Sequence, residues 1–478
     1  MKSIFRFDTT YFELPENFYS KIQFRGVPHP EWVLHNDSLA KDLNISTEFT
    51  EDLLQILVGN QLDENSIPFA QAYAGHQFGH FTMLGDGRAT MLGEHLDGKG
   101  NRWDIQLKGS GRTAFSRRGD GKATLRSMLR EYLFSEAMHH LNIPTSRSLA
   151  VIKTGEEVYR EEIHQGAILT RVMKSHIRVG TFEFARYFGG IDEVEALLNY
   201  TIKRLYPELK NAENPALELL KTVMHGQIDL VVEWLRVGFI HGVMNTDNTS
   251  ISCETFDYGP CAFLGNYHPG TVFSSIDTEG RYAFENQSKI LQWNLARLGD
   301  TLLPLIDSDE NKAVKLATTL IESFAQIYFQ KWYEMMFRKI GIEEEQEGDA
   351  ALVEELLDLM FSYQKDFTHT FTYLREPHWF EGTEFQLGKE FDSWISRWKE
   401  RIQDSPNWKN LMQKNNPVVT PRNYFVELAL ENAENDNWEI FHEFLKVLQQ
   451  PYEFSEKVKN FWFSPPHFDR GYVTFCNT

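Results

Sequence analysis

Cysteine is scarce in this chain, which has three in 478 residues: Cys253, Cys261 and Cys476. No two of them form a C-x-x-C pair, and an odd number in a chain this long does not make a disulfide framework. The sequence therefore excludes the small secreted domains that depend on disulfides. It predicts a protein whose thiols are reduced, as they are in the cytoplasm.

Positive charge and long apolar runs are also lacking. The chain has 48 lysines and arginines against 68 aspartates and glutamates, a net charge of −20. Because non-specific binding to nucleic acid or anionic membranes needs a basic face, neither is expected as the main activity. No segment approaches the roughly 20 apolar residues of a membrane span, and residues 1–15 resemble neither a signal peptide nor a transit peptide. We expect a cytoplasmic monomer with no nucleic-acid or membrane partner.

The apolar content is nevertheless sufficient for large cores, with 42% hydrophobic and 14% aromatic residues. Residues 103–108 alternate as a half-buried strand does, and residues 124–141 carry apolar side chains at helical spacing. We expect an α+β fold with a β-rich lobe, a helical lobe and the functional site at their junction. The predicted parts are an N-terminal extension (1–65), the β-rich lobe with nucleotide-binding loops (66–180), the helical lobe with catalytic and metal loops (181–305) and a helical C-terminal extension (306–478).

The stretch from His241 to Gly259 carries the strongest functional signal. A protein-kinase catalytic loop reads H-R-D-L-x-x-x-N and is followed by D-F-G. Here Asn248 follows His241 at the same spacing, and Asp257 begins D-Y-G. Asn248 and Asp257 offer one amide and one carboxylate oxygen, which suit a magnesium ion that also binds phosphate oxygens. The stretch therefore predicts a nucleotide and metal site.

One residue in this loop departs from the kinase pattern. Val243 stands where a kinase has its catalytic aspartate, and valine cannot accept a proton. Asp247 is the nearest replacement and is our candidate for the catalytic base. The alternative is that Asp247 only stabilises a turn, because Asn-Thr-Asp-Asn is also good turn chemistry.

Residues before this loop predict the phosphate-binding half of the site. Lys108 ends a predicted strand and Glu131 lies beside the apolar stripe of the predicted helix, the order of the lysine–glutamate pair in kinase-like folds. A partly buried glutamate needs a cation, although Lys108 could also be an ordinary surface lysine. The segment from Gly85 to Arg88 is either a hairpin turn or a loop whose backbone N–H groups approach phosphate.

Basic residues gather in the same region of an otherwise acidic chain. Guanidinium groups pair with phosphate in a bidentate manner, so the cluster favours a triphosphate site over a solvated loop. The cluster comprises Arg112, Arg117, Arg118 and Lys122, with Arg171 and Arg178 as further candidates. His76 and His80 lie four residues apart and could share a helical face as metal ligands. No third ligand stands at a fitting spacing, so we interpret them as structural.

Several ordered motifs together resemble the selenoprotein O (YdiU) family. The resemblance runs from about residue 66 to 300, and a helical tail with a cysteine near its end also fits. The motifs are AGHQFG (74–79), LGDGR (84–88), LKGSG (107–111), RGDG (118–121), SEAM (135–138), residues 241–248 and DYGP (257–260).

This resemblance implies a protein-kinase-like fold and protein adenylyltransferase activity, in which AMP passes from ATP to Ser, Thr or Tyr hydroxyls of proteins. It also implies Mg²⁺ or Mn²⁺ as cofactor, uridylylation with Mn²⁺, and ATP bound in a flipped orientation that presents the α-phosphate. Asp247 would be the proton acceptor, Asn248 and Asp257 would hold the metal, and Lys108 would contact phosphates and pair with Glu131. The nucleotide site would be lined by Gly85, Gly87, Arg88, Asp120, Gly121, Arg171 and Arg178.

The resemblance further implies redox control through a cysteine near the end of the chain, the place that Cys476 takes. Its partner is left open, since Cys253 and Cys261 are the two other cysteines. Two further functions remain as alternatives: an atypical kinase that transfers the γ-phosphate, and a non-catalytic pseudokinase scaffold that binds nucleotide.

Overall fold

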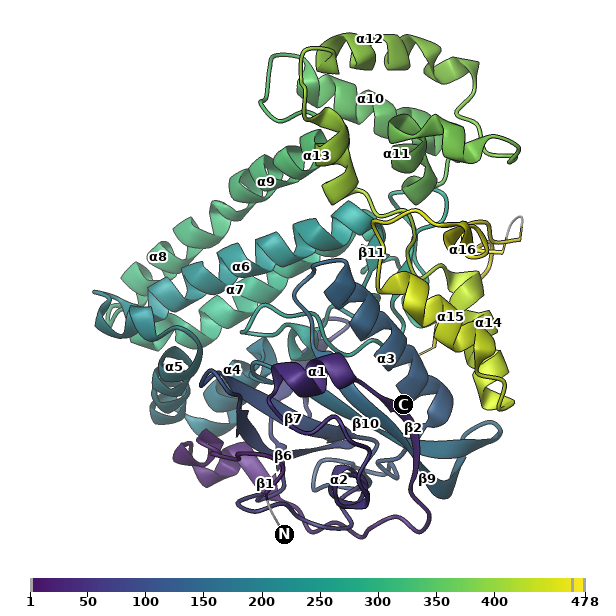
Figure 1. Ribbon diagram of the computed structural model, residues 1–478. Coiled ribbons are helices and arrows are strands. Elements are labelled where there is room, and N and C mark those ends of the chain that lie inside the picture. Colours follow the sequence, from purple (N-terminus) through teal and green to yellow (C-terminus); the bar gives the residue numbers. More distant parts are fainter. Residues whose placement is uncertain (1–2, 466–467, 476–478) are drawn as a thin grey trace.

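The computed structural model describes residues 3–465 and 468–475 (Figure 1). The strands are β1 (Tyr19–Lys21), β2 (Glu31–His35), β3 (Phe69–Gln71), β4 (Ala74–Gln77), β5 (His80–Met83), β6 (Ala89–Leu96), β7 (Arg102–Lys108), β8 (Ala123–Thr124), β9 (Arg147–Tyr159), β10 (Ile163–Met173), β11 (Phe239–Ile240) and β12 (Ala262–Phe263). The α-helices are α1 (Asp37–Asp42), α2 (Glu51–Leu57), α3 (Leu125–His140), α4 (Val179–Phe184), α5 (Ile191–Leu205), α6 (Pro215–Val237), α7 (Gln287–Ile306), α8 (Glu310–Glu322), α9 (Phe324–Lys339), α10 (Asp349–Ser362), α11 (Phe367–Arg375), α12 (Asp392–Ile402), α13 (Trp408–Asn415), α14 (Asn423–Glu434), α15 (Glu439–Leu448) and α16 (Glu456–Lys459). Among the shorter turns of helix, η3 (Ala185–Gly189) is a π-helix and η5 (Thr246–Asn248) is a 3₁₀-helix.

The β-rich lobe is an antiparallel sheet of eight strands. Seven strands follow the order β1-β3-β6-β7-β10-β9-β2, and β8 pairs with β10. Successive side chains of a strand point to opposite faces, so Met91 enters one hydrophobic core and its neighbour Leu92 enters another. The sheet is thus covered on both faces, which explains the long apolar runs in its central strands.

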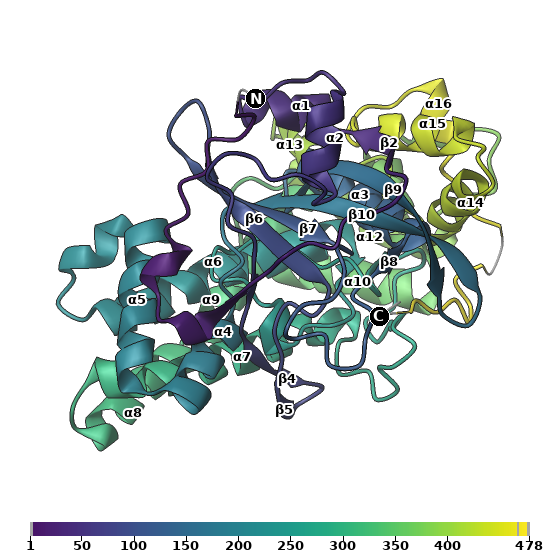
Figure 2. The ribbon, with the colours of Figure 1, turned by 90° about the horizontal axis from the view of Figure 1, so that it is seen from below.

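The N-terminal residues are part of this sheet. The segment from residue 1 to 65, expected as an extension packed on the lobe, supplies both outer strands, since β1 pairs with β3 and β2 pairs with β9. Its helices α1 and α2 contact β9 (Figure 2). Their apolar side chains Leu39 and Leu53 belong to the smaller core. The predicted division of the chain stays a prediction, but the sheet is not complete without these residues.

Helix α3 begins and ends where the sequence predicts. The Thr124 hydroxyl accepts a hydrogen bond from the backbone N–H of Ser127, which satisfies one of the free N–H groups at the helix start. The helix packs on β9 and β10 and is in turn contacted by α14 and α15 (Figure 1). It therefore lies between the sheet and the C-terminal helices.

The helical lobe is built on α6 and α7, with α8 and α9 packed beside them. Gly238 ends α6 with a left-handed backbone (φ of 79°) and turns the chain into β11 and the His241 loop. Residues 310–339 form two successive helices, α8 and α9, rather than one. Ser323 separates them, and its hydroxyl bonds to the carbonyl of Leu320, a contact that competes with the helix backbone.

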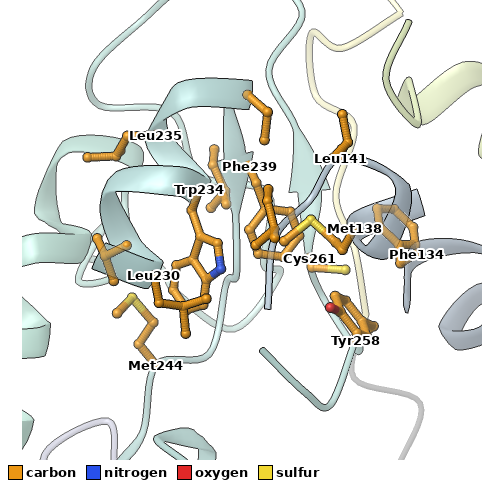
Figure 3. Packing of buried hydrophobic residues seen from close by; sticks show 14 of the residues in the cluster. Phe134, Met138, Leu141, Leu230, Trp234, Leu235, Phe239, Met244, Tyr258 and Cys261 are labelled. Carbon is orange, nitrogen blue, oxygen red and sulfur yellow. The ribbon is translucent and has the colours of Figure 1, made fainter. Parts of the chain in front are cut away.

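A dense core beside the D-Y-G segment joins α3 to α6 (Figure 3). Phe134 and Met138 of α3 lie on one side of it and Trp234 of α6 on the other, and Tyr258 and Cys261 pack beside Met138. Tyr258 and Cys261 are at most 2% exposed, so the two side chains anchor the loop that carries Asp257. No helix in the described part of the chain is long and apolar enough to cross a membrane.

Candidate active site

A cavity of about 560 Å³ lies where the sheet meets the helical lobe. It collects predicted site residues from segments that are far apart in the sequence. These are Gly85, Gly87, Arg88, Lys108, Asp120, Gly121, Arg171, Arg178, Asp247, Asn248 and Asp257. Arg118 and Lys122 of the basic cluster also line this cavity, whereas Arg112 and Arg117 do not. Arg112 donates to the carbonyl of Arg117 instead.

Two cations and two carboxylates form a cluster beside this cavity, in which Lys108, Arg171 and Glu131 are buried and the Asp257 side chain is 32% exposed. The Lys108 ammonium lies 2.5 Å from a Glu131 oxygen and is also bonded to Asp257. The Arg171 guanidinium donates to the other Glu131 oxygen at 2.8 Å and to Asp257 at 3.2 Å. The lysine–glutamate pair is thus formed, and Arg171 completes it. Burial alone would raise the pKa of Glu131, but Arg171 and Lys108 lower it.

Asp257 is held in a constrained position. Its backbone is left-handed, with a φ of 64°, a conformation that is uncommon outside glycine and often found at functional sites. Burial would raise the pKa of its carboxyl, but Lys108, Arg171 and Arg88 lower it well below its usual range. Asp257 is therefore a carboxylate that faces the cavity.

The residues that could hold a metal ion are Asn248 and Asp257. The Asn248 amide nitrogen donates to the carbonyl of Val243 at 3.1 Å, so its oxygen is the atom left for a ligand. Among the described residues, no group of three or more His, Cys, Asp or Glu side chains could hold a metal. Two protein oxygens fit a magnesium ion that takes its remaining ligands from phosphate and water, and they do not fit a metal site made by protein alone.

The His241 loop is fixed from inside the helical lobe. The His241 backbone N–H donates to the side chain of Gln287 at 3.0 Å, and its ring Nε2 lies 3.1 Å from the carbonyl of Phe256. Burial lowers the pKa of His241, so the imidazole is neutral and serves as a structural link between the catalytic loop and the D-Y-G segment. It does not line the cavity.

Asp247 has the properties of a proton acceptor. It is 6% exposed, and its Oδ1 has no hydrogen-bond partner in the structure. Burial raises the pKa of its carboxyl to about 6. A buried carboxyl with a pKa near the working pH is suited to general base catalysis. Arg178 donates to the backbone carbonyl of Asp247 at 3.1 Å and so fixes the loop rather than neutralising the carboxylate directly.

The hairpin of β4 and β5 covers Asp247, which the sequence did not reveal. Gln77 donates weakly to Asp247 Oδ2 at 3.4 Å, and the backbone N–H of His76 donates to the Thr246 hydroxyl at 2.7 Å. A β-carbon built on Gly75 would lie 2.6 Å from Asp247 Oδ1. The stretch is visibly rich in Gly, Gln and His, but no local pattern shows which loop it meets.

His76 and His80 are not joint metal ligands. They belong to β4 and β5, and His80 pairs with Gln77, so they do not share a helical face. His76 Nδ1 lies 2.5 Å from Glu183 of α4, and Glu183 also accepts a hydrogen bond from Thr246 at 2.5 Å. The structural interpretation of His76 agrees with these bonds. Glu183, which burial gives a pKa of about 7, links the hairpin to the catalytic loop and was missed from the sequence.

The glycine-containing loops are shaped by close backbone contacts. Gly85 has a φ of 138°, and a β-carbon there would lie 2.3 Å from the ring of Phe115. Gly85 and Gly87 both line the cavity, so the chain passes the proposed phosphate site at residues without a side chain. Asp120 pairs with Arg160 at 2.8 Å, and Arg160 is a further cavity residue that the sequence did not single out.

The described cysteines do not contribute to the cavity. Burial raises the pKa of both Cys253 and Cys261 to about 12, so neither is a thiolate near neutral pH. Cys476, the candidate for redox control, lies outside the described residues.

Comparison with known proteins gives consistent matches over nearly the whole chain. The sequence profile described as "Protein adenylyltransferase SelO" matches residues 3–449. A relative from Nitrosococcus oceani, named "Protein nucleotidyltransferase YdiU", is 50% identical over 99% of this chain and 97% of its own length. A relative of the same name from Clostridium perfringens is 48% identical over 100% of this chain and 98% of its own length. Another, from Pelagibacter ubique, is 50% identical over 99% of both chains.

Among solved structures, ROP2 from Toxoplasma gondii, described as "a virulence factor with a protein-kinase fold and no enzymatic activity", covers 69% of this chain and 97% of its own. The sequence identity is 10% and the TM-score is 0.26, which is too low to compare positions. The kinase-like character follows instead from the elements themselves: Lys108 ends a sheet strand, Glu131 lies on the next helix, and Asp257 opens the loop after Asn248.

Proposed function

The chain belongs to the SelO family of protein adenylyltransferases, and on this basis we propose that it transfers AMP from ATP to Ser, Thr or Tyr hydroxyls of proteins with Asp247 as the proton acceptor. It is a nucleotidyltransferase that acts on proteins, as the family is.

The transfer is a displacement at the α-phosphorus of ATP. The hydroxyl oxygen of the acceptor forms a bond to the α-phosphorus, and the bond from that phosphorus to the bridging oxygen of the β-phosphate breaks. Pyrophosphate leaves with the bonding electrons, and the hydroxyl proton passes to Asp247. The protein forms no covalent bond in this step, so its contribution is positioning and charge stabilisation.

The cationic side of the cavity suits the charge that develops on the phosphates. Lys108 and Arg171 are each paired with Glu131 and Asp257, and Arg88 lies close enough to lower the pKa of Asp257. Donors fixed in this way stabilise a transition state without reorganising during the reaction. Asn248 and Asp257 would hold Mg²⁺ or Mn²⁺, which supplies Lewis-acid stabilisation of the phosphate oxygens when bound.

One observation carries the proposal. Val243 takes the position that the catalytic aspartate has in kinases. Among the described residues of the loop 241–248, Asp247 is the only carboxylate that lines the cavity. Asp247 carries a pKa of about 6 and comes directly before the metal-binding Asn248. Asp247 stands four residues after the position of the kinase base. A base at this position suits a nucleotide that presents its α-phosphate instead of its γ-phosphate, which is the flipped orientation that the family resemblance implies.

The test uses ATP labelled separately at the α- and γ-phosphates, incubated with the full-length protein and a protein acceptor. Label from the α-phosphate alone on protein supports the proposal. Label from the γ-phosphate alone overturns it in favour of an atypical kinase, and no label with retained ATP binding indicates a nucleotide-binding scaffold. The same assay with UTP and Mn²⁺ measures uridylylation. The cytoplasmic location and the monomeric state stay predictions.

A further inference from the structure

A second cavity, of about 540 Å³, adjoins the first. The two cavities share five lining residues, which are Arg88, Lys108, Asp247, Asn248 and Asp257. The first cavity contains the glycine loops and most of the cations, so it suits the nucleotide. A transferase with two substrates needs two sites that meet at the reacting groups. Asp247, whose Oδ1 has no partner in the structure, lies where these two meet.

We propose that the second cavity is the acceptor site and that it binds a segment of the acceptor protein with a neutral, apolar side chain beside the reacting hydroxyl. This proposal rests on the proposed function. The apolar part of the lining comes from α3, the catalytic loop, α14 and the C-terminal segment Phe468–Phe475. These residues are Met128, Val243, Leu430, Phe468, Val473 and Phe475.

The C-terminal segment is fixed to the loop that follows D-Y-G. The backbone N–H of Thr474 donates to the carbonyl of Phe273 at 2.7 Å, and the N–H of Ser275 donates to the carbonyl of Thr474 at 2.9 Å. The Thr474 hydroxyl also donates to the carbonyl of Pro260 at 2.7 Å. Pro260 follows Asp257 by three residues in the sequence, so these bonds fix the segment to the D-Y-G loop, and the segment can serve as a wall of the cavity.

Four consecutive residues of this segment, 472–475, line the cavity. Tyr472 donates through its hydroxyl to Glu427 at 2.6 Å, and Thr474 is 4% exposed. Val473 and Phe475 are 43% and 61% exposed, so they offer the larger apolar surface. Exposed large apolar side chains that lie together are typical of a binding surface. Val473 and Phe475 line the same cavity as the proposed base, Asp247.

Two arginines of the lining, Arg126 and Arg130, are already paired with carboxylates of the protein. Arg126 lies 2.6 Å from Glu434, and Arg130 lies 3.3 Å from Glu427. A charged acceptor side chain would have to compete with these pairs, whereas an apolar one needs only the exposed surface of Val473 and Phe475. This difference is the reason to expect a neutral, apolar neighbour to the hydroxyl.

The experiment compares short peptides that contain one serine and either phenylalanine or alanine one or two positions away. The variant V473S/F475S removes the apolar wall. The matched control is V314S/F329S, which changes a valine 41% exposed and a phenylalanine 55% exposed on α8 and α9. AMP incorporation gives kcat/KM for each peptide, and pyrophosphate release measures cleavage of ATP in the same reactions.

We expect the wild-type protein and the control to favour the phenylalanine peptide by about tenfold at one or more positions, because a buried phenyl ring contributes that much or more. The ratio should fall to about one in V473S/F475S, because kcat/KM for the phenylalanine peptide falls to the value for the alanine peptide. Three outcomes overturn the acceptor site. The wild-type protein shows no preference between the peptides, or it releases pyrophosphate but labels neither peptide, or V473S/F475S keeps the preference for the phenylalanine peptide. Absence of α-phosphate cleavage in the wild type overturns the proposed function instead.

Discussion

Asp247 lies directly against the α-carbon of Gly75. A β-carbon on Gly75 would come within 2.6 Å of Asp247 Oδ1 and within 2.9 Å of the Asp247 β-carbon, distances that real atoms do not share without a shift. The β4–β5 hairpin therefore touches the proposed base closely at Gly75, where there is no side chain, in addition to the Gln77 contact. The position of the reactive carboxylate is set by a part of the sheet lobe far away in the sequence.

Replacement of Gly75 by alanine should displace Asp247. The backbone of Gly75 is not left-handed, so alanine adds a steric contact without backbone strain. We expect kcat for AMP transfer to fall by roughly a hundredfold, because a displacement of about 1 Å in a reacting group has effects of that size. The KM for ATP should change little. The control is Gly98→Ala, whose β-carbon meets only the Asn44 side chain, at 3.3 Å; full activity in Gly75→Ala would contradict the contact.

Asp247→Asn keeps the size of the side chain and removes the proton acceptor. AMP transfer should fall by about 10² to 10⁴-fold, the usual contribution of a general base. ATP affinity, measured by calorimetry, should remain within a fewfold of wild type because the cations of the nucleotide cavity are unchanged. Wild-type transfer rates in this variant would show that Asp247 is only a turn residue.

The pH dependence of the reaction should report the carboxyl of Asp247. Its pKa is raised to about 6, so the carboxylate is present above that pH and is lost as the pH falls through it. We expect kcat to be level near neutral pH and to decrease about tenfold per pH unit below about 6. The same titration in Asp247→Asn should lose this slope. A slope centred near pH 4 would mean that burial does not perturb this group.

Glu131→Gln should destabilise the fold. Glu131 is 2% exposed and balances both Lys108 and Arg171, and removal of one partner from a buried charge cluster costs about 3–5 kcal/mol. The free energy of unfolding, measured with denaturant, should fall by that amount. Glu434→Gln is the control, since its pair with Arg126 is partly exposed and should contribute less than about 1 kcal/mol. Equal effects of the two variants would contradict the buried cluster.

Asp257→Ala and Asn248→Ala should both weaken the response to divalent metal. We expect chelation of Mg²⁺ to stop transfer by the wild-type protein, and Asn248→Ala to need at least about tenfold more Mg²⁺ for half of its maximal rate, because one of two protein ligands is gone. Asp257→Ala should lose metal-dependent turnover. The readout is pyrophosphate release against metal concentration, and a wild-type response in either variant removes that residue from the metal site.

Local patterns were sufficient to predict several parts of this site. Lys108 follows an alternating strand and Glu131 sits on a helix with clear apolar spacing, so their pairing followed from the order of elements. The spacing of His241, Asn248 and Asp257 likewise identified the loops that reach the cavity. The family resemblance then assigned roles that geometry alone would have left open.

Contacts between distant segments could not be predicted in the same way. The hairpin over Asp247, the bond from His76 to Glu183 and the C-terminal wall of the second cavity each join residues whose local sequences carry no sign of one another. The boundary between helices α8 and α9 could not be predicted from the sequence for a different reason. The apolar pattern continues through Ser323, and the hydroxyl that interrupts the backbone has no effect on that pattern.

Because β2 pairs with β9, its pairing in the sheet is delayed during synthesis of the protein until β9 has been made. His35 lies opposite Ala150, so a ribosome adds about 115 residues after β2 before its neighbour exists. At about 5–20 residues per second this interval is roughly 6–23 s. Throughout it, β2 presents unpaired backbone groups that other strands can bind. A factor that shields nascent chains would therefore act on this protein mainly in that interval, on residues that are later an outer strand of the sheet.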